Sequence, residues 1–277
     1  MYSIHASNVS KSIKGKDILI DVSIELNPAS IIGLCGHNGS GKTTLLKSLL
    51  GLYKCKGTIK NNCNSVKTIF DTPPEDKNLT VYDYLKFFFL LYSGRQAKKS
   101  DVLTILDRVN LSKCINKKMS TLSFGMKKMV YISTLLIGET SLAIVDEPFN
   151  GLDTQSIAIV KNLLVELKNT QHATILISSH LLHELESICD GFIEIVSQRA
   201  YQTQRLSISC QELCLVCDDN EKTKALLSKC CTYVSRDHGC YYLKLSNMFS
   251  SMDIVKLLLE NQILFSEIYY LRGKFSD

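Results

Sequence analysis

The sequence predicts an α/β protein built on a mostly parallel sheet, and three observations support this fold class. Between about 30 and 196, short apolar runs suited to buried strands alternate with segments of helical periodicity. Residues 1–28 instead alternate polar and apolar side chains around a turn-forming Lys-Gly-Lys-Asp at 14–17, which predicts an antiparallel β region. Residues 206–277 read as strands, one helix and a last strand, which predicts a small α+β extension.

The first half of the parallel region can be assigned from periodicity alone. An apolar strand at 30–35 leads into a helix that begins near 44, and two short strands are expected within 57–70. A helical subdomain is expected over about 79–137, with Thr80 as the N-cap of its first helix. This subdomain therefore interrupts the strand–helix alternation.

The alternation resumes after the helical subdomain and ends at a polar stretch. Strands are expected at 142–145, 174–177 and 192–196, and helices at 156–168 and 183–188. Residues 198–205 are rich in Gln and Arg, so we place a boundary there. The predicted domains are 1–200 and 206–277.

The composition is that of an ordinary globular chain. Of 277 residues, 45% are hydrophobic and 21% charged, and the net charge is +5. Basic residues are scattered rather than gathered in one run, so charge does not indicate nucleic acid as a partner. No run approaches the ~18 consecutive apolar residues of a membrane-spanning helix. The start of the sequence lacks the features of a secretory signal, so a cytosolic protein is expected.

Eleven cysteines are present, and the odd number argues against a disulfide framework. Six of them come late in the chain, and Cys214-x-x-Cys217 followed by Cys230-Cys231 offers a possible zinc site. The apolar, strand-like surroundings favour the other interpretation, in which they are buried thiols.

The most specific motif is Gly-His-Asn-Gly-Ser-Gly-Lys-Thr at 36–43, a phosphate-binding loop between a predicted strand and a predicted helix. Glycines let the loop curl so that backbone N–H groups point at phosphate oxygens. Lys42 is expected to reach the β- and γ-phosphates of ATP, and the Thr43 hydroxyl to bind Mg²⁺. The nucleotide-binding residues of the loop are then Gly36, Asn38, Gly39, Ser40, Gly41, Lys42, Thr43 and Thr44.

A second group of polar residues follows two later strands. The apolar run 142–145 ends in Asp146 and Glu147, and we expect this strand to lie beside the loop strand. Asp146 is expected to hold Mg²⁺, and Glu147 to orient the attacking water. His180 follows the strand at 174–177, where it is placed to contact the γ-phosphate. The catalytic set is therefore Lys42, Glu147 and His180.

A third motif, Leu-Ser-Phe-Gly-Met at 122–126, opens another helix. Ser123 and Gly125 at a helix N-terminus form a second anion-binding element. Because the loop at 36–43 already accounts for one nucleotide, the simplest use of Ser123 and Gly125 is to contact a nucleotide held by a partner subunit.

Together these motifs resemble the ATP-binding subunit of an ABC transporter over residues 1 to about 200. The resemblance implies the phosphate-loop NTPase fold of the ABC type, with 36–43 as Walker A, 122–126 as the signature and 142–147 as Walker B. It adds Gly151-Leu152-Asp153 as the D-loop, so Asp153 joins the nucleotide-binding residues. It also implies a head-to-tail homodimer that encloses two ATP molecules, bound to polytopic permease subunits at the cytoplasmic face of the membrane.

The departures from the family pattern are informative. Phe124 and Met126 differ from the usual signature, and Ile13 stands where an adenine-stacking aromatic residue is expected, with Tyr2 as a candidate substitute. Asp71 stands where the family has glutamine, so the resemblance implies a contact with Mg²⁺ or the attacking water. An acid followed by Thr-Pro there resembles the subgroup that exports bacitracin- and lantibiotic-type peptides.

The function predicted from the sequence is therefore an ATP-binding and hydrolysing subunit that powers export of a peptide such as a bacteriocin or lantibiotic. The resemblance implies that the permease docks around 72–95, where Phe87-Phe88-Phe89 reads as core with one ring exposed as the contact. Two alternatives stay open: a soluble ABC ATPase that acts on a non-transport partner, and a catalytically weak regulatory subunit. Residues 206–277 resemble the family's C-terminal extensions only loosely.

Overall fold

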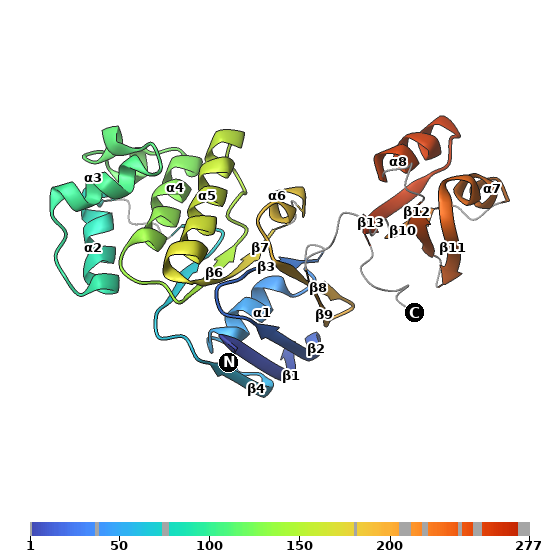
Figure 1. Ribbon diagram of the computed structural model, residues 1–277, viewed down its shortest axis with the longest axis horizontal. Coiled ribbons are helices and arrows are strands. Elements are labelled where there is room, and N and C mark those ends of the chain that lie inside the picture. The colour runs from blue at the N-terminus through green and yellow to red at the C-terminus, as the bar shows by residue number, and fades with distance from the viewer. Residues whose placement is uncertain are drawn as a thin grey trace. The chain divides into compact units, whose positions relative to one another are not determined.

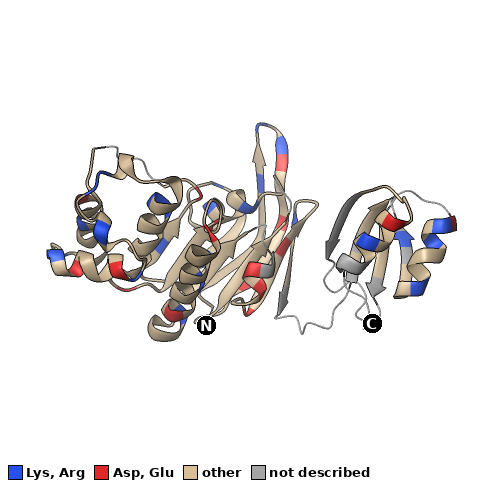
Figure 2. Ribbon diagram, turned by 90° about the horizontal axis from the view of Figure 1, so that it is seen from above, with Lys and Arg blue, Asp and Glu red and all other residues tan. Residues whose placement is uncertain are grey.

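The computed structural model describes residues 2–36, 39–73, 78–179, 182–204, 212–217, 221–237, 240–245 and 251–270. It divides into two compact units, Met1–Gln204 and Arg205–Asp277, which are described separately. In the view of Figure 2, Lys and Arg are interspersed with Asp and Glu along the first unit, as the scattered charges of the sequence indicate.

The first unit begins with an antiparallel sheet of order β2-β1-β4 (Figure 1), which confirms the predicted antiparallel region. Its strands are β1 (Ile4–Ile13), β2 (Lys16–Leu26) and β4 (Lys56–Asn61). The turn between β1 and β2 contains Lys14 and Gly15, both with positive φ, so the hairpin closes where the sequence predicts. Away from the turn, apolar residues such as Ile4, Ala6, Val22, Ile24 and Leu26 alternate with polar ones and are buried.

A six-stranded sheet of order β5-β6-β7-β3-β8-β9 forms the centre of the unit. Its strands are β3 (Ile31–Cys35), β5 (Val66–Ile69), β6 (Leu142–Asp146), β7 (Thr174–Ser178), β8 (Gly191–Val196) and β9 (Arg199–Gln204). All neighbouring pairs are parallel except β8 with β9, so the predicted, mostly parallel sheet is confirmed. One expectation is wrong: β6 does not lie beside the loop strand β3, because β7 lies between them.

Both faces of this sheet are covered, which explains why its strands read as continuous apolar runs. Ile31, Val145 and Ile177 face a core built with the helical region, whereas neighbours such as Ile32 and Ile144 face a second core. The second core is shared with α1 and the antiparallel sheet (Figure 1). The period of two in each strand therefore divides the unit into two layers of packing.

Helices occupy the predicted regions. They are α1 (Lys42–Leu49), α2 (Val81–Ser93), α3 (Lys99–Asp107), α4 (Phe124–Ser133), α5 (Thr154–Gln171) and α6 (Leu182–Glu186), with 3₁₀ turns η1 (Ser112–Cys114), η2 (Met119–Thr121) and η3 (Thr134–Leu136). Thr80 is the N-cap of α2, because its hydroxyl accepts the N–H of Asp83 at 3.1 Å. Within α2, Phe88 and Phe89 are buried and Phe87 is exposed.

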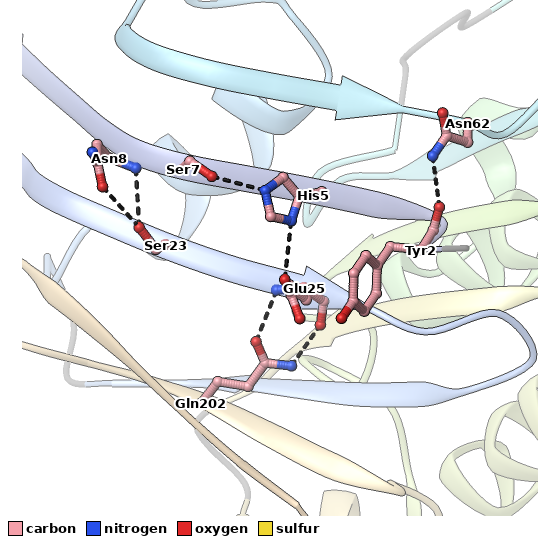
Figure 3. A network of polar contacts seen from close by, with 8 residues as sticks. All are labelled: Tyr2, His5, Ser7, Asn8, Ser23, Glu25, Asn62 and Gln202. Atoms are coloured by element: carbon pink, nitrogen blue, oxygen red, sulfur yellow. Dashed lines mark hydrogen bonds and ion pairs between the residues drawn. The ribbon is translucent and has the colours of Figure 1, made fainter.

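The polar stretch at 198–205 contains a strand that periodicity did not predict. β9 pairs with β8 as the edge of the central sheet, so the first unit continues to Gln204. Its Gln202 side chain bonds both backbone groups of Glu25, accepting the N–H at 2.9 Å and donating to the carbonyl at 2.5 Å (Figure 3). An edge strand of polar residues is stabilised here by its neighbours rather than by apolar burial.

Figure 3 also shows where Tyr2 lies. Its ring stacks on His5 with centroids 5.8 Å apart, and the carboxylate of Glu25 raises the pKa of the Tyr2 hydroxyl. Tyr2 precedes β1, whereas Ile13 is the last of the ten residues of that strand. A strand of this length spans roughly 30 Å. Tyr2 therefore does not replace the aromatic ring that is missing at Ile13.

The second unit is a four-stranded antiparallel sheet of order β11-β12-β10-β13 with two helices. Its elements are β10 (Glu212–Cys217), α7 (Glu221–Cys230), β11 (Cys231–Asp237), β12 (Cys240–Leu245), α8 (Ser251–Glu260) and β13 (Phe265–Tyr270). The chain order β-α-β-β-α-β with this strand order is the split β-α-β arrangement. The helix α7 differs from the expectation, which had a single helix late in this region.

Three of the late cysteines, Cys217, Cys230 and Cys231, lie in or next to the core of this unit. Cys230 is buried, and burial raises the pKa of the Cys231 thiol to about 12. Among the described residues, no group of His, Cys, Asp and Glu is arranged to hold a metal ion. The burial of Cys230 agrees with the buried-thiol interpretation at that position, while Cys210 lies outside the described residues.

Lys67 of β5 gives the fold a pH-dependent feature that can be measured. Its side chain is 1% exposed and donates to the carbonyl of Leu135, and burial lowers its pKa to about 8 from 10.5. Between about pH 8 and pH 10 the unfolded state then binds more protons than the native state, so stability rises with pH. We expect the free energy of unfolding to gain up to about 3 kcal/mol over this window relative to Lys67→Met.

Urea unfolding of the wild type and of Lys67→Met at pH 8, 9 and 10 checks this expectation. The comparison with Lys67→Met removes the contribution of other groups that titrate in this window, including the exposed lysines. If the difference between the two proteins does not change with pH, the Lys67 ammonium keeps its ordinary pKa.

Candidate functional site

The glycine loop connects β3 to α1 and leaves the N-terminus of that helix open. Gly41 is its N-cap with φ of 108°, and no side chain caps the helix. A Cβ atom at this position would also lie 3.1 Å from the carbonyl oxygen of Ile18 in β2, so only glycine fits. The buried hydroxyl of Ser40 has no hydrogen-bond partner in the described part of the chain. The loop therefore offers unsatisfied donors to an anion.

Lys42 begins α1 and is 8% exposed. Its ammonium donates to the carbonyl of Gly36 at 2.7 Å and lies 3.9 Å from Glu147 Oε1. The lysine therefore bridges the start of the glycine loop and the acid that follows β6. This places two of the predicted catalytic side chains within one ion pair.

Asp146 connects the loop to the end of β6. It is buried, and its Oδ2 accepts the Thr43 hydroxyl at 2.8 Å across a separation of 103 residues. Its Oδ1 accepts the Ser178 hydroxyl at 2.5 Å. Ser178 pairs with Asp146 in the register of β6 and β7, so β7 fills the space between the acid and the loop strand. The structure brings two of the three predicted magnesium ligands, Thr43 and Asp146, together.

Glu147 adopts the left-handed backbone region with φ of 47°, which non-glycine residues visit rarely. Contacts on both its N–H and its carbonyl hold it there. Its N–H donates to the Ser178 hydroxyl at 2.9 Å, and its carbonyl accepts the Lys128 ammonium at 2.6 Å. Such conformations persist where the surroundings impose them, and they concentrate at functional sites.

Asp71 lies at the same edge of the sheet, beyond the end of β5. Its Oδ1 accepts the Lys128 ammonium at 3.0 Å and the Asn150 amide at 3.4 Å, and its side chain is half-exposed. The third predicted magnesium ligand is thus bonded to a lysine of α4 rather than to Thr43 or Asp146.

Ser123 and Gly125 form a separate group with the predicted D-loop. The Ser123 hydroxyl caps α4 by accepting the Met126 N–H at 3.2 Å. The Phe124 ring, 48% exposed, packs on Gly151, which has φ of 74° and no room for a Cβ atom. Asp153 caps α5 through the N–H of Ser156, and this hydrogen bond lowers the pKa of the Asp153 carboxyl.

The remaining predicted site residues lie at the end of β1, in the glycine loop and α1, or outside the described residues. Ile13 is 36% exposed at the end of β1. Gly36, Gly39 and Thr44 lie in the loop and the first turn of α1. Asn38 and His180 lie outside the described residues.

Two residues that hold the site together have no predicted role. Ser178 is the last residue of β7 and pairs with Asp146, the last residue of the parallel strand β6. The shared position at the ends of two predicted strands was the signal that could have identified it. Lys128 is charged and lies in an amphipathic helix, where sequence patterns favour a solvated side chain. Its complete burial depends on tertiary contacts that the sequence pattern does not show.

The donor set fits ATP with Mg²⁺. The unpartnered Ser40 hydroxyl, the uncapped start of α1 and the Lys42 ammonium suit phosphate oxygens. The Thr43 hydroxyl and the Asp146 carboxylate are oxygen ligands of the kind that Mg²⁺ prefers, and they already lie in contact. The fold and this site define a phosphate-loop nucleotide-binding domain.

Comparisons with known proteins specify the family. The ABC transporter family model matches residues 19–150. The bacitracin transport ATP-binding protein BcrA of Enterococcus faecalis is 35% identical over 68% of this chain and 65% of its own length. The lantibiotic transport ATP-binding protein SrtF of Streptococcus pyogenes is 32% identical over 70% of this chain and 89% of its own.

A further relative and a solved structure also match this chain. The cytochrome c biogenesis ATP-binding export protein CcmA of Reclinomonas americana is 37% identical over 62% of this chain and 82% of its own. A solved ATP-binding subunit of an ABC transporter has a TM-score of 0.67 at 27% identity, covering 73% of this chain and 89% of that one. The chain belongs to the ABC transporter family of ATP-binding proteins, and the resemblance of its motifs to that family is confirmed. It spans slightly less than two thirds of the length of BcrA.

Proposed function

We propose that the protein binds and hydrolyses ATP as the nucleotide-binding subunit of a membrane ABC transporter. The convergence of Lys42, Thr43, Asp146 and Glu147 at the carboxyl ends of the central strands carries this proposal. Family membership and relatives named for transport support it.

The side chains have distinct roles in the proposed reaction. Loop N–H groups and the Lys42 ammonium bind the phosphates, and Ser40 adds a hydroxyl donor. Thr43 and Asp146 would hold Mg²⁺, which when bound neutralises charge that develops on the phosphates. Glu147 accepts a hydrogen bond from the attacking water and orients it toward the γ-phosphate. The separation of 3.9 Å between the Lys42 ammonium and Glu147 Oε1 supports these roles, because both groups are proposed to act at the γ-phosphate.

Ser123 and Gly125 are proposed to act on the ATP of a second subunit. Gly125 lies against the Gly151 carbonyl and the Leu152 side chain of the predicted D-loop. An equivalent head-to-tail arrangement in a twofold dimer supplies each loop with the signature of its partner. His180 and Asn38 are assigned by the motif alone, and Ile13 leaves the adenine without the usual aromatic ring.

The membrane subunit is proposed to dock on α2 from the cytoplasmic side. Phe87, Leu90 and Leu91 are 55–59% exposed and lie on one face of that helix at spacings of three and four residues. A separate polytopic permease is part of this proposal. Among the described residues, no helix is long and apolar enough to cross a bilayer.

The proposed cargo is a peptide of the bacitracin or lantibiotic class. The support is the Asp71-Thr-Pro sequence and the names of BcrA and SrtF. CcmA is named for a different export process, so a domain of this kind is not restricted to peptide cargo.

Two measurements on one preparation test the proposal. The chain is expressed with an affinity tag beside its neighbouring genes, extracted in mild detergent and assayed for ATP hydrolysis. We expect Mg²⁺-dependent hydrolysis and copurification of a polytopic membrane protein, which a triple exchange of Phe87, Leu90 and Leu91 for Ser weakens. Hydrolysis without any membrane partner would favour the soluble ABC ATPase, and no hydrolysis with a partner would favour the regulatory subunit.

A further inference from the structure

Lys128 on α4 is buried inside the first unit, with an exposed fraction of 0%. Its ammonium donates to three oxygens: Asp71 Oδ1 at 3.0 Å, the carbonyl of Glu147 at 2.6 Å and the carbonyl of Asn150 at 3.1 Å. A lysine has three N–H donors, so each has a partner. A buried ammonium tolerates no loss of these partners, and its position is therefore tightly defined.

The three oxygens belong to three segments of the site. Asp71 follows β5, Glu147 follows β6, and Asn150 lies in the turn that leads to Gly151 and α5. The lysine itself lies five residues after Ser123, on the helix that Ser123 caps. One side chain thus joins the helical subdomain to all three segments.

Glu147 depends on this contact more than an ordinary residue would. Its positive φ needs support from its surroundings, and contacts on both sides contribute: Ser178 accepts its N–H, while its carbonyl accepts the Lys128 ammonium at 2.6 Å and the Asn150 N–H at 3.4 Å. Ser178 anchors Glu147 to the central sheet, whereas Lys128 anchors it to α4. The orientation of the Glu147 carboxylate is therefore linked to the position of the helical subdomain.

We propose that Lys128 is a positioning residue for ATP hydrolysis, an inference that rests on the proposed function. It holds the backbone at Glu147 and Asn150, so that the Glu147 carboxylate faces the nucleotide only while α4 is docked. Asp71 acts in this arrangement by neutralising Lys128. Asp71 Oδ1 accepts hydrogen bonds from the Lys128 ammonium of α4 and from the Asn150 amide, and these two bonds fix its position.

Lys128→Met tests the proposal, with Lys127→Met as the matched control. Both changes remove one ammonium from α4, but the Lys127 side chain is only partly buried. The first readout is hydrogen–deuterium exchange without nucleotide. We expect the segment 147–152 to exchange at least ~10-fold faster in Lys128→Met, with 142–146 and the Lys127→Met protein unchanged.

The second readout is steady-state hydrolysis. We expect kcat to fall at least ~10-fold in Lys128→Met while KM for ATP stays within about threefold, because the phosphate-binding loop is untouched. A general loss of structure would instead raise KM and lower the melting temperature. Lys128→Arg keeps the charge and is expected to recover part of kcat.

Lys128→Met also leaves the half-exposed Asp71 carboxylate without its ammonium partner, which adds a second change to the site. The double variant D71N/K128M removes both charges and avoids that problem, yet it still lacks the donor to Glu147 and Asn150. We expect it to fold and to show the same rapid exchange and low kcat.

Wild-type exchange at 147–152 or wild-type kcat in the double variant would overturn the proposal. If the wild-type protein itself hydrolyses no ATP, the proposed function fails. The exchange measurement still decides whether Lys128 holds the segment.

Discussion

The Glu147→Gln variant is expected to bind ATP and to hydrolyse it at least ~10²-fold more slowly than the wild type. Glutamine has nearly the same shape, so the contacts of the Glu147 backbone with Ser178 and Lys128 are retained. What changes is the ability of the side chain to accept a proton from the attacking water. The variant should also lose the ionic attraction to Lys42, whose ammonium lies 3.9 Å away.

Two assays check this result. Single-turnover hydrolysis gives the rate of the chemical step, and gel filtration with ATP and Mg²⁺ shows whether the variant accumulates as an ATP-bound dimer. Near-normal turnover would mean that another group orients the water, and Glu147 would then lose its assigned role. Binding of a fluorescent ATP analogue with wild-type affinity is the control for an intact fold.

The Lys42→Ala variant should lose affinity for ATP by ~10- to 100-fold, because a charge-assisted hydrogen bond contributes about 1.5–3 kcal/mol. The ammonium is nearly buried and lies beside the uncapped start of α1, where its charge is poorly screened. Equilibrium binding of ATP and of AMP measures the effect. The loss should be large for ATP and small for AMP, since AMP lacks the β- and γ-phosphates.

Unchanged ATP affinity in Lys42→Ala would contradict the assignment of the glycine loop as the phosphate site. Lys47→Ala is a suitable control on the same helix. Lys47 lies in the last turn of α1, and its ammonium packs over the rings of Tyr53 and Phe70 rather than over the loop.

Much of the first unit could be predicted because its strands are buried on both faces. Such strands read as short apolar runs, and Ile31–Cys35, Leu142–Asp146 and Thr174–Ser178 are all of this kind. The edge strand Arg199–Gln204 is polar, and backbone pairing and Gln202 stabilise it, so periodicity could not show it. The helix Glu221–Cys230 was missed because its first turns are polar.

The candidate site also has some residues that the sequence predicts and others that it does not. Lys42, Thr43, Asp146 and Glu147 could be predicted because each belongs to a motif whose spacing reflects the chemistry of phosphate binding. The order of the strands could not be predicted, because no local sequence pattern indicates that β7 lies between β3 and β6. Lys128 could not be predicted either, because the oxygens that satisfy its ammonium come from residues 71, 147 and 150.

The position of β7 has a consequence for how the protein is made. A nascent chain that has reached Glu147 already contains the glycine loop and both acids, but it lacks the strand that joins them. The loop and the acids can take their final places only after Thr174–Ser178 has been synthesised and inserted between β3 and β6. The complete site therefore cannot form while the nascent chain ends at Glu147, and it requires the later strand β7.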